Sequence, residues 1–157
     1  ILRNISLANL FGIARGSVLD KRREAQVAEG YRKQLAIRTP GVQQKVVNLS
    51  GGNQQKVVLS KWLFTDPALL ILDEPTRGID VGAKFEIYSL MARLAAEGKC
   101  IVMVSSEMPE LLGMCDRIYV MNEGRFVAEM PAAEASQEKI MRAIVNNGLN
   151  NGTAAAA

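Results

Sequence analysis

The sequence of 157 residues predicts an α/β domain with a mainly parallel sheet flanked by helices. Two short apolar runs, 68–72 and 100–104, have the length of strands and are apolar on both faces, which is typical of buried parallel strands. A helix-length segment, 81–97, lies between them. Because strands that alternate with helices form parallel sheets, we expect any ligand site at the carboxyl ends of these strands.

Residues 1–16 show no clear pattern, and two helices are predicted after them. The pattern predicts a helix over 18–37, with Ser17 or Asp20 as its capping residue. A second helix is expected over 51–64.

The C-terminal third should contain a short helix, a hairpin and a final helix. We predict a helix over 109–114 and strands over 117–121 and 126–130, joined by an Asn-Glu-Gly turn. The last helix should span 136–145, and the Asn-, Gly- and Ala-rich segment 146–157 is expected to be disordered.

Composition limits the chemistry that the chain can perform. It has no histidine, which excludes histidine-based acid–base catalysis and histidine metal sites within this chain. Cys100 and Cys115 match no metal or redox spacing, so we expect two reduced core thiols.

Charge is unevenly distributed along the chain. Residues 1–61 carry 11 Lys or Arg against 3 Asp or Glu, whereas residues 62–157 carry 8 against 13. A basic half can bind nucleic acid or an acidic partner. It also fits a solvated helix face, because 21–23 is flanked by Asp20 and Glu24 and no aromatic residue interleaves with these cations.

The segment Leu-Ser-Gly-Gly-Asn-Gln-Gln over 49–55 has the features of a phosphate-binding helix start. The first amides of a helix have no internal acceptor, and the helix dipole adds positive potential there. Glycines at Gly51 and Gly52 would let a phosphate approach, and the Ser50 hydroxyl is one more donor. An ordinary capped helix after a glycine turn is the alternative.

Two carboxylates follow the first predicted strand directly. Asp73 could hold Mg²⁺, directly or through water, and Glu74 could orient or deprotonate an attacking water. A surface turn before Pro75 is the alternative. Further along, Asp80 is suited to cap a helix, and Ser106 follows the second strand.

Taken in order, these motifs resemble those of ABC-type ATPases. LSGGNQQ is similar to the ABC signature, with Asn53 at a position where Gln is usual. LLILDEPT resembles Walker B with its glutamate. RGID resembles the D-loop, and VSSE occupies the switch-loop position. The string from about Val42 to Phe126 resembles the second ATPase half of bacterial sugar-importer subunits. The resemblance implies the C-terminal part of a P-loop NTPase domain over 1–145, with a helical subdomain over about 1–49.

In that family, ATP and Mg²⁺ are held between two ATPase domains. The resemblance implies that the γ-phosphate of ATP on the facing domain is contacted by signature residues, namely Ser50, Gly51, Gly52, Asn53 and Gln54. It also implies that Asp73 serves Mg²⁺, that Glu74 is the catalytic carboxylate and that Asp80 touches the facing domain. Expected partners are this facing domain, membrane permease subunits and, indirectly, a periplasmic sugar-binding protein, at the cytoplasmic face of the plasma membrane.

Two departures from the family pattern are visible. The Walker A pattern is absent from the sequence, because the only Gly-Lys pair is Gly98-Lys99, with Arg93 where the first glycine should be. We therefore expect Walker A and the glutamine loop upstream of Ile1. The switch histidine is replaced by Ser106, so this half's own ATP site is expected to be degenerate.

Three functions remain open: the ATP-hydrolysing subunit of a sugar importer, a non-hydrolysing half-site that donates its signature, and an ABC ATPase that acts on nucleic acid. The basic first half motivates the last, although no nucleic-acid partner is expected; salt-sensitive binding to DNA or RNA would support it. We also expect exposed apolar faces, with marginal stability or self-association in isolation.

Overall fold

The computed structural model describes residues 1–154, including the side chains of residues 1–146, and divides into two compact units. The first unit comprises Ile1–Val104 and the second begins at Ser105. Among the described residues, no helix is both long and apolar enough to cross a bilayer.

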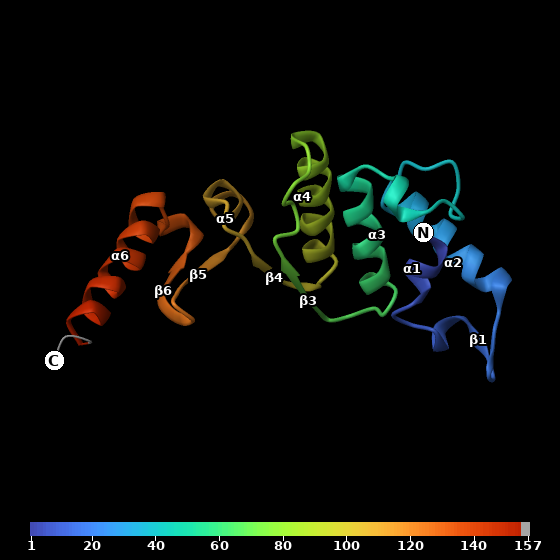
Figure 1. The fold of residues 1–157 in the computed structure, drawn as a ribbon, viewed down its shortest axis with the longest axis horizontal. Coiled ribbons are helices and arrows are strands. Elements are labelled where there is room, and N and C mark those ends of the chain that lie inside the picture. The colour runs from blue at the N-terminus through green and yellow to red at the C-terminus, as the bar shows by residue number, and fades with distance from the viewer. Residues whose placement is uncertain (155–157) are drawn as a thin grey trace. The chain divides into compact units, whose positions relative to one another are not determined.

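The first unit begins with helices and one small hairpin (Figure 1). Its elements before the sheet are α1 (Leu2–Ser6), η1 (Phe11–Ile13), β1 (Ala14–Arg15), β2 (Val18–Leu19), α2 (Lys21–Gln34), η2 (Val46–Asn48) and α3 (Gly51–Leu63). The helix predicted from residue 18 starts three residues later, because 18–19 pairs with β1 instead. Of the two capping candidates Asp20 is the cap, since its carboxylate accepts the N–H groups of Arg22 and Arg23.

The β-α-β part of the unit confirms the predicted parallel pairing. Strand β3 (Leu69–Asp73) pairs in parallel with β4 (Cys100–Val104), and helix α4 (Val81–Ala96) connects them and lies beside α3 in Figure 1. The register aligns Leu69 with Cys100 and Asp73 with Val104.

The expectation that both faces of these strands are buried is wrong for the described residues. Leu70 and Leu72 are buried, whereas Leu69 and Ile71 are 50% and 68% exposed. Val102, which pairs with Ile71, is also exposed. An apolar run on both faces does not reveal which face other elements cover, and among the described residues the face of Ile71 and Val102 is exposed.

This exposed face also explains the position of one cysteine. Cys100 pairs with Leu69 on that face and is exposed, so the expectation of a core thiol is wrong for it. Cys115 is half-buried, and both thiols are free, as expected.

The second unit has the predicted order of elements. These are α5 (Met108–Met114), β5 (Arg117–Asn122), β6 (Arg125–Pro131), η3 (Ala132–Glu134) and α6 (Gln137–Ala154). The strands form an antiparallel hairpin, and the buried side chains of Ile118, Val120 and Ile140 make its core.

Helix α6 is longer than the sequence predicts. It continues to Ala154, through most of the segment expected to be disordered, and residues 155–157 lie outside the described residues. No proline interrupts this segment, so the helical backbone can continue through it.

Candidate functional site at the start of helix α3

The start of α3 has an incomplete cap. Ser50 is the N-cap residue and is exposed, but its side chain accepts no backbone N–H of the first turn. Among the described residues, the amides of Gly51, Gly52 and Asn53 have no backbone or side-chain acceptor. These donors lie at the positive end of a helix of 13 residues, an arrangement suited to an anion.

The side chain of Asn53 connects Ser50 to the loop after α2. Its Oδ1 accepts the backbone N–H of Arg38 at 2.8 Å, and its Nδ2 donates to Ser50 Oγ at 2.8 Å. Gln54 lies on the same turn but donates to the Leu49 carbonyl at 2.9 Å, which closes the loop before the helix.

The two glycines have different structural roles. A Cβ added at Gly52 would lie 2.4 Å from the Cβ of Ala83, so this glycine permits the close approach of α3 and α4. A Cβ at Gly51 would meet only Ile79 Cγ2 at 3.2 Å and the Gly78 carbonyl at 3.5 Å. Gly51 is exposed and Gly52 is buried, so the space that Gly52 leaves is filled by α4 rather than open to a ligand.

A salt-bridge network connects α3, α4 and the loop that follows α2. Lys56 on α3 is buried, and its ammonium lies 2.6 Å from the Glu86 carboxylate on α4 and 3.2 Å from the Ala36 carbonyl. Arg38 adds a second contact to Glu86 at 3.0 Å. Hydrogen bonding to Lys56 and the nearby positive charges lower the pKa of Glu86 below its usual range. This network has no signal in the sequence, because its partners are 20–48 positions apart along the chain.

The acidic pair lies where β3 ends. Asp73 is exposed and is the last residue of the strand. Glu74 adopts a positive φ of 45°, which is unusual for a non-glycine residue, and its N–H donates to the Val104 carbonyl at 2.8 Å. The turn thus breaks the strand abruptly between the two carboxylates.

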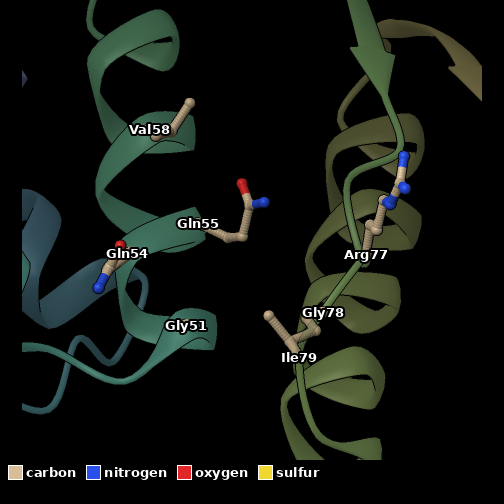
Figure 2. Close-up of a pocket in the computed structure, with 7 residues that line it drawn as sticks. All are labelled: Gly51, Gln54, Gln55, Val58, Arg77, Gly78 and Ile79. Carbon is tan, nitrogen blue, oxygen red and sulfur yellow. The ribbon is translucent and has the colours of Figure 1, made fainter.

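Asp80 performs the local role that its position predicts. Its carboxylate accepts the Ala83 N–H at 2.9 Å and caps α4. The preceding residues, Arg77–Ile79, form with α3 an open pocket of about 260 Å³. Figure 2 shows the side chains of Gln55 and Ile79 extending into the space between α3 and this loop.

Ser106 belongs to the second unit, so we do not include it in the site that Asp73 and Glu74 form in the first unit. The adjacent Ser105 makes two local hydrogen bonds: its Oγ accepts the Glu107 N–H at 3.0 Å and donates to Glu110 at 2.7 Å. Ser106 itself is exposed.

The residues of the first unit fit parts of a nucleotide site. The exposed Asp73 carboxylate can supply one ligand to Mg²⁺, which commonly takes one or two carboxylates together with phosphate and water oxygens. The α3 amides and the Ser50 hydroxyl can supply donors to a phosphate.

Comparison with known proteins agrees with this fold. The profile of the family described as ABC transporter matches residues 4–77. An ATP-binding cassette of an ABC transporter shares the fold, with a TM-score of 0.74 at 21% identity over 90% of this chain and 61% of the other. A dimeric cassette in a post-hydrolysis state, bound to ADP and phosphate, gives a TM-score of 0.70 at 26% identity over 83% and 56%. Residues 4–77 therefore match part of an ABC transporter domain, and most of this chain is similar to ATP-binding proteins of transporters.

The chain is also similar to ATP-binding subunits of sugar transporters. It is 57% identical to the L-arabinose transport ATP-binding protein of Geobacillus stearothermophilus, over 97% of this chain and 30% of that protein. It is 56% identical to the xylose import ATP-binding protein of Thermoanaerobacter pseudethanolicus, over 90% and 28%. The ribose import ATP-binding protein of Clostridium perfringens is 57% identical, over 85% and 26%. The chain thus spans less than a third of the length of these relatives.

Proposed function

We propose that this chain is part of the ATP-hydrolysing, energy-coupling subunit of a sugar importer, and that the start of α3 contacts the γ-phosphate of ATP on a facing ATPase domain. One observation carries the proposal: the amides of Gly51, Gly52 and Asn53 have no acceptor among the described residues, and the Ser50 hydroxyl does not cap them. The similarity to three sugar-import subunits supports the choice of transport process.

The acidic pair, Asp73 and Glu74, has a separate role in this proposal. When ATP is bound, Mg²⁺ neutralises phosphate charge, and Asp73 is the residue that would hold it. Glu74 would orient the attacking water and accept its proton. Asp80, which caps α4, would lie against the facing domain. The remaining partners are the permease subunits and, indirectly, a sugar-binding protein.

The test is a Ser50→Ala substitution in the assembled transporter. Loss of a hydrogen bond to a charged phosphate costs about 1.5–3 kcal/mol, so ATP turnover should fall by about 10- to 100-fold. Ser89→Ala, an exposed serine on α4, is the matched control and should keep full turnover. Turnover within about twofold of wild type in Ser50→Ala would contradict the proposed phosphate contact.

A second candidate is a half-site that donates its signature but does not hydrolyse ATP itself. The sequence feature that favours it is Ser106 at the switch position, where it cannot offer an imidazole. Glu74→Gln in the assembled transporter separates the two. The first function predicts a fall in turnover, since the carboxylate would no longer accept a proton. Unchanged turnover would favour the half-site.

A further inference from the structure

The orientation of the Asn53 side-chain amide is determined by its contact with Arg38. A backbone N–H can only donate, so the atom that lies 2.8 Å from the Arg38 nitrogen must be the carbonyl oxygen of Asn53. The amide NH₂ group therefore faces Ser50 Oγ, at 2.8 Å.

This arrangement leaves the Ser50 hydroxyl hydrogen available. A serine hydroxyl has one hydrogen to donate, and here its oxygen accepts a bond from Asn53. Among the described residues, the Ser50 hydroxyl has no hydrogen-bond acceptor for its own hydrogen, and Ser50 is exposed. The hydroxyl can therefore donate to an incoming acceptor without breaking a bond inside the protein.

The loop that binds Asn53 is itself held in place. The Arg38 guanidinium binds Glu86 at 3.0 Å, and Glu86 also binds the buried Lys56 at 2.6 Å. The position of the Arg38 amide is thus tied to both α3 and α4, which makes Asn53 a fixed rather than a freely rotating neighbour of Ser50.

We propose that Asn53 is a positioning residue that directs the Ser50 hydroxyl hydrogen towards the γ-phosphate of ATP on the facing domain. This inference rests on the proposed function, because it needs that phosphate as the acceptor. Asn53 acts through Ser50 and need not touch the nucleotide.

Asn53→Asp tests the direction of the hydrogen bond with almost no change in shape. The new carboxylate still accepts the Arg38 amide, but it cannot donate to Ser50, so the Ser50 hydroxyl donates to the carboxylate instead and loses its free hydrogen. In the assembled transporter, kcat should fall by about tenfold or more. The KM for ATP should stay within about threefold, because the facing domain holds most of the nucleotide.

A purely structural role would give another result. A carboxylate in the first turn of α3 is favourable for the helix dipole, so Asn53→Asp should not lower the melting temperature. If activity and melting temperature fall together, the residue supports the fold rather than the hydroxyl, and the proposal is overturned.

Two comparisons isolate the proposed route. Gln55→Glu adds the same negative charge two residues further along α3 and measures the fall in kcat that charge alone causes. This fall should be smaller than the fall caused by Asn53→Asp. In a Ser50→Ala background no hydroxyl remains to be directed. There, Asn53→Asp should lower kcat no more than Gln55→Glu does.

The outcomes distinguish this inference from the proposed function. If Ser50→Ala alone leaves turnover unchanged, the phosphate contact itself fails. If Ser50→Ala lowers turnover but Asn53→Asp is equally harmful with and without the Ser50 hydroxyl, the contact stands and the positioning role of Asn53 is refuted.

Discussion

Replacing Gly52 with alanine should weaken the packing of α3 on α4. The added Cβ would lie 2.4 Å from the Cβ of Ala83, whereas carbon atoms in ordinary contact lie about 3.5–4.0 Å apart. The two helices must therefore separate by about 1 Å or more at this point. Overpacking of this kind costs about 1–3 kcal/mol, so we expect the free energy of unfolding, measured by equilibrium urea denaturation, to fall by that amount.

Two further variants show whether contact with Ala83 causes the loss. Gly51→Ala is the matched control, because its Cβ would meet a movable Ile79 methyl group at 3.2 Å, and it should cost less. Ala83→Gly removes the opposing Cβ, so the Gly52→Ala/Ala83→Gly pair should show a favourable coupling of about 1 kcal/mol or more. If Gly52→Ala is no more destabilising than Gly51→Ala, or if the coupling is absent, the packing explanation for Gly52 is wrong.

Two other predictions concern titratable groups. Because the folded state lowers the pKa of Glu86, the salt bridge to Lys56 stabilises the fold above the ordinary glutamate pKa and this contribution is lost as the pH falls through the lower, folded-state pKa. The Glu86 carboxylate is partly exposed and screened by solvent, so Glu86→Gln should lower the free energy of unfolding at pH 7, measured by urea denaturation, by at most about 1 kcal/mol. The variant should also lose less stability on acidification than the wild type. An unchanged pH dependence would contradict this role of Glu86. Burial and nearby Asp116 raise the pKa of the Cys115 thiol, so at pH 8 Cys115 should react more slowly with a thiol reagent than the exposed Cys100. Cys100→Ser should remove the faster phase, and loss of the slower phase instead would refute this assignment.

Much of the local structure could be predicted because its causes lie within a few residues. The caps at Asp20 and Asp80 each bind amides two or three positions away, and the hairpin of β5 and β6 follows from its Asn-Glu-Gly turn. The parallel pair β3–β4 follows from two apolar runs separated by one helix.

Features that depend on distant residues could not be predicted. The sequence alone favours Gly52 as space for a phosphate, because it does not show that Ala83 occupies that space. Asn53 has an acceptor role towards Arg38 that depends on the path of the intervening loop. The roles of Ser50, Asp73 and Glu74 towards ATP stay predictions, since they depend on groups outside the described residues.

The start of α3 is connected to α4 by three contacts of different kinds. Gly52 permits van der Waals contact with Ala83, Asn53 hydrogen-bonds the loop at Arg38, and Glu86 on α4 binds both Arg38 and Lys56. The three contacts join the first turn of α3, the loop at Arg38 and helix α4 at different points. We therefore expect the first turn of α3, which holds the proposed phosphate donors, and the cap of α4 to move together.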